Sequence, residues 1–550
     1  MAKATRFTQE LVDEYISKGY WTGETTTELW DLNAQLYGDV EALVDSRKRL
    51  TWGEIKQQSD NLAGHLLEMG LKRGDIVHVF LPNCADSYLL RLACEKAGIL
   101  CLTSLMGLRE REIEHVLANF QVAGMAMPLS FRGFDYAQAV NAMRPKLPAL
   151  KYVFNMGDEK APGFISLDEL AQKPAGKQHD FDKTRFKYDE VAIVGLTSGT
   201  TGMPKVSEHI IASRVTLGDS YHSMVKLTGD DVILNVISAV AGLGAAFCYS
   251  NVREAAKTVC LEIWNAKEAL RLIEKERPTV ILGAPAQLAM LVREYDPKKH
   301  DANSLRVVYC GTSPMTYEIA KAGEERFKVP VLNTYGSFDG GGMASNSVDD
   351  DEETRRGTVG RPFKGNEIKI VNGDGKEVSQ GEIGEVLFRG ACACGGYYKD
   401  IERTTEMWGE LGIHGWFRTG DLAKYNQNNQ IVLTGRKKDV IIRGGQNIYP
   451  SEIEGLLFMH PKVKHVAVVA MPDPVMGEKA CAFVVPKGGA EFTFPEMIEF
   501  LKDQKIAKFK LPERLEIRDE LPLRDSQKVA KDGLREEIIE KLKAEAEISG

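Results

Sequence analysis

The ten residues from Leu196 to Lys205 constrain the fold of this chain more than any other stretch of its sequence. They read Leu-Thr-Ser-Gly-Thr-Thr-Gly-Met-Pro-Lys, and the apolar run at residues 191–194 before them predicts a short buried strand. Two glycines and four hydroxyl residues leave backbone N–H groups accessible to a bulky anion, and Lys205 adds a positive charge. The pattern therefore predicts a strand that leads into a phosphate-binding loop.

This loop differs from the usual P-loop on both sides of its lysine. Pro204 has no N–H to donate, and Val206 stands where a P-loop carries Ser or Thr. A polar surface loop with an isolated lysine is the alternative interpretation of this segment alone. The motifs found later in the chain favour the phosphate loop.

Strands and helices are expected to alternate through most of the chain. Apolar runs at residues 76–80, 232–237 and 307–310 predict buried strands, with helical patterns between them. Such alternation is typical of an α/β fold with parallel sheets. A dinucleotide-binding fold is disfavoured, because Phe247 stands where a third glycine should follow Gly242-Leu243-Gly244.

Composition excludes several classes of protein. The 550 residues are 43% hydrophobic and 27% charged, which is typical of a globular protein with a large core. A net charge of −8 without a strongly basic segment argues against a nucleic-acid partner. The longest apolar region, residues 232–249, is interrupted by Asn235 and Ser238, so it is expected to be buried core and not a membrane span.

The cysteines and the N-terminus indicate a cytoplasmic enzyme. Nine cysteines are scattered without a Cys-x-x-Cys pair, which is typical of reduced thiols. Cys392 and Cys394 lack further zinc ligands nearby in the sequence. The first residues lead into an acidic amphipathic stretch and carry no apolar signal core.

The loop closely resembles the phosphate loop of the AMP-forming adenylating enzymes, a superfamily of acyl-CoA synthetases, adenylation domains of peptide synthetases and luciferases. Further segments resemble the family's motifs in the same order, from about Leu50 to Lys531. These segments are Gly311-Thr312-Ser313-Pro314-Met315, Tyr335-Gly336-Ser337-Phe338-Asp339, Gly415-Trp416-Phe417-Arg418-Thr419-Gly420-Asp421-Leu422, Thr434-Gly435-Arg436-Lys437-Lys438-Asp439 with the run that follows it to Glu454, and Leu521-Pro522-Leu523-Arg524-Asp525-Ser526-Gln527-Lys528.

The resemblance implies a two-domain α/β architecture. A large N-terminal adenylation domain, residues 1–437, is expected to contain parallel and mixed sheets with flanking helices and a β-barrel-like part. A small mobile α+β domain, residues 438–550, is expected to rotate about a hinge at Lys438. Arg443, Gly444 and Gly445 match the turn that lines the coenzyme A tunnel after this rotation.

The resemblance also assigns the nucleotide and metal residues. Catalytic roles fall to Lys528, Lys205 and Thr200, and Asp339 is expected to hold Mg²⁺. The tyrosine at 335 matches the one that packs on adenine, and Asp421 and Arg436 match the ribose-binding pair. The full ATP- and AMP-binding set comprises Thr197, Ser198, Gly199, Thr200, Thr201, Gly202, Lys205, Gly311, Thr312, Ser313, Asn333, Tyr335, Gly336, Asp421, Arg436 and Lys528.

Three positions depart from the family pattern. Phe338 replaces a threonine and removes a hydroxyl expected near the phosphates, and Asp339 replaces a glutamate and so has a shorter reach. Gln527 replaces the glycine before the catalytic lysine. These departures raise a third interpretation, a nucleotide-binding regulatory protein without catalysis. Retention of Lys528, Asp421 and Arg436 argues against it.

The acid pocket is expected to be wide and apolar. It is assigned to Val240, Ala241, Gly311, Gly336, Phe338 and Gly341, and the one-residue uncertainty in register leaves either Val240 or Ala241 at the family's pocket position. Small residues there, and the similarity of residues 15–21 to benzoate- and cyclohexanecarboxylate-type ligases, predict an alicyclic or aromatic acid.

The predicted function is that of an acid–CoA ligase that uses ATP, Mg²⁺ and coenzyme A. Two alternatives stay open: an acyl- or aryl-AMP ligase that loads a carrier protein, and a medium-chain fatty acyl-CoA synthetase. The sequence leaves both a monomer and a homodimer possible.

Overall fold

The computed structural model describes residues 4–157, 159, 161–197, 205–240, 242–523 and 529–549. The chain forms two compact units. The first comprises Met1–Met315, Ile319–Ile368 and Phe388–Phe417. The second comprises Thr316–Glu318, Lys369–Leu387 and Arg418–Gly550.

A seven-stranded sheet in the first unit carries both ends of the predicted phosphate loop. Strand β10 lies between β4, which runs parallel to it, and β11, which runs antiparallel. The order across the sheet is β11 (Lys205–Ile210), β10 (Val191–Thr197), β4 (Leu100–Thr103), β3 (Ile76–Val79), β5 (Gly124–Pro128), β8 (Tyr152–Met156) and β9 (Ile165–Ser166). A short hairpin of β6 (Ser130–Phe131) and β7 (Phe134–Asp135) stands apart from this sheet.

A nine-stranded sheet in the same unit carries the predicted adenine and metal motifs. Its centre is parallel, and β17 pairs antiparallel with β16 at one side. The order is β18 (Arg361–Pro362), β17 (Gly341–Ser345), β16 (Val331–Ser337), β15 (Val307–Cys310), β14 (Val280–Gly283), β12 (Val232–Asn235), β13 (Lys257–Cys260), β1 (Glu41–Val44) and β2 (Arg49–Thr51). The predicted α/β class with parallel and mixed sheets is confirmed.

Helices cover these sheets and form most of the remaining structure of the first unit. They are α1 (Gln9–Ser17), α2 (Thr26–Leu36), α3 (Trp52–Glu68), α4 (Ala85–Ala97), α5 (Glu110–Asn119), α6 (Tyr136–Met143), α7 (Leu167–Gln172), α8 (Phe181–Thr184), α9 (Ile211–Val225), α10 (Gly242–Ser250), α11 (Ala266–Glu276), α12 (Pro285–Glu294), α13 (Tyr317–Phe327), α14 (Glu352–Gly357) and α15 (Ile401–Trp408).

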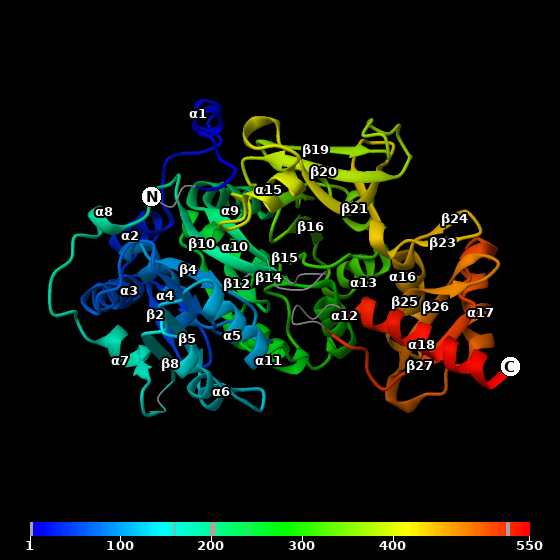
Figure 1. The fold of residues 1–550 in the computed structure, drawn as a ribbon, viewed down its shortest axis with the longest axis horizontal. Helices are drawn as coiled ribbons and strands as arrows, with labels where there is room; N and C mark the ends of the chain where they lie inside the picture. Colours follow the sequence, from blue (N-terminus) through cyan, green and yellow to red (C-terminus); the bar gives the residue numbers. More distant parts are fainter. Residues whose placement is uncertain are drawn as a thin grey trace. The chain divides into compact units, whose positions relative to one another are not determined.

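Helix α4 is buried along its whole length, because α2, α3, β3 and β4 all pack against it. Figure 1 labels α2, α3 and β4 close to α4. It ends at Gly98, whose left-handed φ of 70° is a conformation that glycine adopts without steric cost. Helix α2 begins with a capping box in which Thr25 and Glu28 bond each other's backbone N–H.

The second unit is α+β, as predicted for the small domain. Its sheet has the order β24 (Gln446–Ile448), β23 (Ile441–Arg443), β26 (Gly477–Pro486) and β25 (Val463–Asp473), and β27 (Arg514–Ile517) pairs with β26. Its helices are α16 (Pro450–Met459), α17 (Phe494–Asp503) and α18 (Lys531–Ser549). It also holds most of a four-stranded sheet with the order β19 (Asn366–Val371), β20 (Gly384–Gly390), β21 (Phe417–Tyr425) and β22 (Ile431–Arg436).

The second unit therefore begins earlier in the chain than the predicted domain boundary at residues 437 and 438. The Ser451 hydroxyl on α16 donates to the Thr434 carbonyl on β22 at 2.7 Å, which joins β22 to the C-terminal elements. The functional boundary and the hinge at Lys438 stay predictions.

Among the helices of the described ranges, none combines the length and the apolar character that a bilayer crossing requires.

Candidate functional site

The two ends of the predicted phosphate loop lie side by side. Strands β10 and β11 form an antiparallel ladder in which Thr197 faces Lys205. The ladder holds the start and the end of the loop at neighbouring positions of one sheet edge. The predicted contacts Ser198, Gly199, Thr200, Thr201 and Gly202 lie outside the described residues.

Tyr397 connects the loop lysine to the predicted metal ligand. Its phenol donates a hydrogen bond to Oδ2 of Asp339 at 2.8 Å, and Nζ of Lys205 lies 5.4 Å from the centroid of its ring. We call Lys205, Asp339 and Tyr397 the phosphate-side cluster. Burial, followed by the charge of Asp339, raises the pKa of Tyr397, so its phenol stays a hydrogen-bond donor.

Sequence reasoning missed Tyr397 as a member of the site. The Gly-Tyr-Tyr triplet at residues 396–398 belongs to none of the motifs that assigned site residues. Tyr397 and Asp339 are separated by 58 positions in the chain, and no local pattern connects them. The available signal was the occurrence of a tyrosine at the end of a strand-rich segment, which is too common to identify a site.

The strand that follows the loop is fixed by the N-terminal segment. Glu208 on β11 is buried, and its carboxylate accepts hydrogen bonds from the Thr5 N–H at 2.6 Å and from the Thr5 hydroxyl at 3.0 Å. Burial raises the pKa of Glu208 to about 7. The N-terminal residues thus support the same strand that positions Lys205.

Phe338 packs toward the phosphate-loop strands. Its ring centroid lies 4.5 Å from that of His209 on β11, and a Cβ added to Gly195 would lie 2.1 Å from Cε1 of Phe338. The ring fills the space that the absent Gly195 side chain leaves on β10. The expected role of Phe338 as a wall of the acid pocket stays a prediction.

The predicted adenine-side residues follow or belong to two adjacent strands. Gly311, Thr312 and Ser313 come directly after β15, where Thr312 has a left-handed φ of 74°. Asn333 belongs to β16 and is buried, and its amide donates to the Thr358 carbonyl at 3.4 Å. One of its two amide N–H donors is therefore already in use within the fold.

Tyr335 and Gly336 lie near the end of β16, where β17 approaches closely. Tyr335 is buried, whereas Gly336 is exposed. A Cβ at Gly336 would lie 2.6 Å from the Gly341 carbonyl oxygen, and one at Gly341 would lie 2.3 Å from the Cys392 carbonyl oxygen. Close packing of the backbone thus leaves no room for a side chain at either glycine. This requirement is independent of their predicted role in the acid pocket.

The predicted acid-pocket segment is held by a buried arginine. Val240 is buried, and Ala241 lies outside the described residues. Arg91 on α4 donates to the Ala239 carbonyl at 2.8 Å, the Cys248 sulfur at 3.2 Å and the Tyr249 hydroxyl at 3.0 Å.

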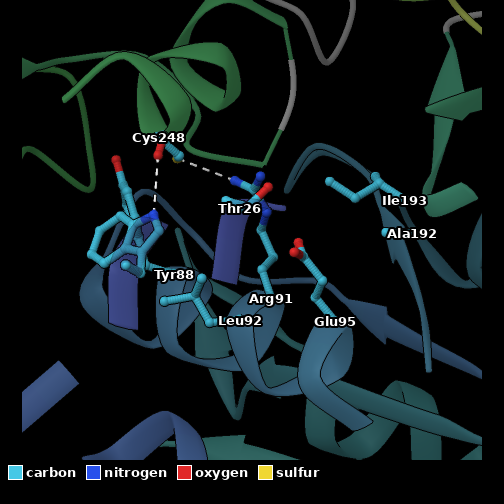
Figure 2. A pocket seen from close by; sticks show the side chains of 9 residues that line it. Thr26, Tyr88, Arg91, Leu92, Glu95, Ala192, Ile193 and Cys248 are labelled. Atoms are coloured by element: carbon cyan, nitrogen blue, oxygen red, sulfur yellow. Dashed lines mark hydrogen bonds between the residues drawn. The ribbon is translucent and has the colours of Figure 1, made fainter. Parts of the chain in front are cut away.

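We call Arg91, Ala239, Cys248 and Tyr249 the Arg91 cluster. It borders a small cavity of about 20 Å³ between α2, α4, β10 and α10 (Figure 2). Figure 2 shows Arg91 reaching toward Cys248 at the edge of this cavity. Among the described residues, Nε of Arg91 and the Thr26 hydroxyl have no hydrogen-bond partner.

The predicted ribose residues meet in the second unit. Asp421 on β21 and Arg436 on β22 are partners in the strand ladder, and Nε of Arg436 lies 3.0 Å from Oδ1 of Asp421. The arginine thereby orients a carboxylate that can accept hydrogen bonds from hydroxyl groups.

The predicted hinge and tunnel residues also belong to the second unit. Nζ of Lys438 lies 3.5 Å from Oδ1 of Asp532, and Nη2 of Arg443 lies 2.7 Å from Oε1 of Glu513. Gly444 and Gly445 form the turn between β23 and β24, with φ values of 55° and 80°. Lys528 lies outside the described residues.

The donor set fits a magnesium ion that is shared with a bound nucleotide. Within the described ranges, no group of three or more His, Cys, Asp and Glu side chains gathers to hold a metal by itself. Mg²⁺ usually binds through one or two carboxylates together with water and substrate phosphates. A single carboxylate such as that of Asp339 matches this mode.

Two family profiles match the chain. Residues 30–398 match the family described as AMP-binding enzyme, and residues 452–528 match the AMP-binding enzyme C-terminal domain. A medium-chain fatty-acid–CoA ligase of Escherichia coli (strain K12) is 30% identical over 545 residues, which cover 98% of this chain and 94% of the relative. The 2,3-dihydroxybenzoate-AMP ligase of Bacillus subtilis (strain 168) is 29% identical over 549 residues and 98% of each chain.

A solved structure shares the fold. The anthranilate CoA ligase AuaEII in complex with anthranoyl-AMP superposes with a TM-score of 0.86 at 22% sequence identity, and the match covers 95% of this chain and 98% of that one. At this identity the likeness concerns the fold alone.

Proposed function

Because the chain belongs to the AMP-binding enzyme family, we propose that it is an ATP-dependent acid–CoA ligase that works through an acyl-adenylate. The observation that carries the proposal is the phosphate-side cluster, which joins the loop lysine and an acidic side chain through one buried tyrosine. The names of the Escherichia coli and Bacillus subtilis relatives, a CoA ligase and an AMP ligase, support the same chemistry.

In the first half-reaction, an oxygen of the substrate carboxylate attacks the α-phosphorus of ATP, and the bond to pyrophosphate breaks. Lys205 and Lys528 place positive charge where the phosphate oxygens become more negative. Asp339 would hold Mg²⁺, which would supply further positive charge to these oxygens when bound. The hydroxyls of the loop, Thr200 among them, donate hydrogen bonds to the same phosphates.

In the second half-reaction, the thiol sulfur of coenzyme A attacks the acyl carbonyl carbon, the bond to AMP breaks, and the thiol proton is lost to solvent. Asp421, oriented by Arg436, holds the ribose in both halves. The small domain rotates about Lys438, which removes Lys528 and brings Arg443, Gly444 and Gly445 to coenzyme A.

The acid substrate is an alicyclic or aromatic carboxylate. The small side chains of the acid-pocket segment, which Arg91 holds through the Ala239 carbonyl, support a wide and dry pocket. Such a pocket discriminates weakly, because one methylene contributes only about 1–3 kcal/mol. A medium-chain fatty acid is the second candidate, favoured by the name of the Escherichia coli relative.

A cytoplasmic location is part of this proposal. All nine cysteines are free and buried, as expected for a protein that functions in a reducing compartment.

The test is a panel of acids incubated with ATP and Mg²⁺, with and without free coenzyme A. We expect AMP, pyrophosphate and an acyl-CoA thioester, with the highest catalytic efficiency for a cyclic acid. Release of acyl-adenylate without thioester formation favours the carrier-loading alternative. If no acid yields pyrophosphate, the proposed function is wrong.

A further inference from the structure

We propose that Tyr397 is a positioning residue that holds Asp339 ready for the metal and Lys205 ready for the phosphates. The proposal rests on the proposed function, because it concerns the same phosphate side of the site. It adds to the site a residue that none of the sequence motifs assigned.

The backbone of Tyr397 is fixed to the strand that carries Lys205. Tyr397 forms an antiparallel bridge with Ser207 on β11, and the next residue donates its N–H to the Val206 carbonyl at 2.8 Å. On the other side, the Tyr397 N–H donates to the Thr404 hydroxyl at 2.9 Å. The residue is 2% exposed, so its ring has little freedom to move.

The phenol fixes the orientation of the Asp339 carboxylate. The family motif carries a glutamate here, and the aspartate is one methylene shorter. The 2.8 Å hydrogen bond from the phenol fixes Oδ2. Hydrogen bonds from a hydroxyl to an ionised carboxylate are stronger than those between two neutral groups. Within the described part of the chain, no hydrogen bond or ion pair engages Oδ1 of Asp339, so this oxygen can bind a metal.

The same ring faces the loop lysine. Nζ of Lys205 lies 5.4 Å from the ring centroid, within the range in which an ammonium group is attracted to an aromatic face. One buried side chain thus restrains both charged groups of the phosphate-side cluster. Tyr397→Phe removes only the bond to Asp339, whereas Tyr397→Leu also removes the aromatic face.

The test measures metal binding without turnover. Mn²⁺ is titrated, with electron paramagnetic resonance detection, into the full chain saturated with a non-hydrolysable ATP analogue. We expect Tyr397→Phe to weaken Mn²⁺ binding about 10-fold, the lower end of the effect of losing a partner of a metal ligand. Tyr397→Phe should bind the ATP analogue with the affinity of the wild type. Tyr397→Leu should bind the analogue more weakly.

Tyr398→Phe is the matched control, because Tyr398 is the adjacent, half-buried tyrosine. It should bind Mn²⁺ like the wild type. Asp339→Asn should lose Mn²⁺ binding, and circular dichroism of each variant confirms folding. Wild-type Mn²⁺ affinity in Tyr397→Phe overturns the proposal, and so does wild-type affinity in Asp339→Asn. A failure of the proposed function is seen separately, as absence of pyrophosphate release by the wild-type enzyme with every acid.

Discussion

The phosphate-side cluster and the Arg91 cluster use buried polar groups in opposite ways. In the first, Lys205 and Asp339 are half-buried and meet around a single tyrosine. In the second, Arg91 is buried, and its terminal nitrogens are occupied by three neutral acceptors of the protein itself. In the proposed function the charges at the first site bind a ligand, whereas the charge at the second holds the predicted acid-pocket segment through the Ala239 carbonyl.

Each region also contains a buried glutamate with a pKa raised to about 7 by burial. Glu208 accepts its hydrogen bonds from Thr5, and Glu95 accepts one from the Thr27 N–H at 3.1 Å. At Glu95, the nearby charges of Arg91 and Arg185 partly offset the rise in pKa that burial causes. At Glu208, only the hydrogen bonds from Thr5 offset this rise in pKa. The comparison predicts that substitutions within the Arg91 cluster affect stability and that substitutions within the phosphate-side cluster affect catalysis.

The largest expected effect is that of Arg91→Met on stability. Loss of the guanidinium leaves the Ala239 carbonyl and the Tyr249 hydroxyl without their donor and removes a positive charge beside Glu95, so we expect a decrease of about 3–5 kcal/mol in the free energy of unfolding. Urea denaturation followed by tryptophan fluorescence measures it. Arg91→Lys should recover part of the loss. An unchanged unfolding midpoint in Arg91→Met contradicts the assigned role of the Arg91 cluster.

Glu208→Gln should change the pH dependence of stability. The folded pKa of about 7 lies above the ordinary value of 4.5, so the folded state binds more protons than the unfolded state between these values. The wild type should therefore lose about 2–3 kcal/mol relative to Glu208→Gln as the pH rises from 5 to 8. Urea unfolding of both proteins across this range gives the difference. A difference that stays constant with pH shows that the carboxyl does not titrate with a raised pKa.

Asp339→Asn should separate catalysis from folding. An asparagine can still accept the phenol hydrogen bond, but it lacks the charge that holds a metal, so we expect acid-dependent pyrophosphate exchange to fall about 100-fold, which corresponds to about 2.7 kcal/mol. The free energy of unfolding should change by less than about 0.5 kcal/mol. If Asp339→Asn lowers the free energy of unfolding but leaves pyrophosphate exchange unchanged, Asp339 has a structural role and not a catalytic one.

The smallest expected effect is that of Thr26→Val beside the Arg91 cluster. The cavity of about 20 Å³ is large enough for one water molecule, and Nε of Arg91 and the Thr26 hydroxyl are its polar walls. Removing one partner of a bound water should cost about 1 kcal/mol of unfolding free energy. Thr26→Ser, which keeps the hydroxyl, is the control. An increase in stability on Thr26→Val indicates that the cavity is dry.

Short motifs carry the predicted site residues, and the roles of those residues stay predictions. The order of hydroxyl, glycine and lysine residues at 197–205 identified the loop, and the family match over residues 30–398 confirms the resemblance drawn from the motifs. Apolar runs predicted the strands that the structure has as β3, β10, β12 and β15, since burial on both faces of a parallel sheet requires continuous apolar stretches.

What the sequence determined by itself was the α/β class, the position of four buried strands and the identity of the motif residues, because each depends on neighbours within a few positions. Tertiary structure alone decided that Tyr397 bonds Asp339, that Phe338 fills the space over Gly195, and that Arg91 holds the Ala239 carbonyl 148 positions away. These contacts join distant segments, and the order of strands in the sheets brings the segments together. Local patterns record which groups will be buried, but not which distant partner satisfies their hydrogen bonds.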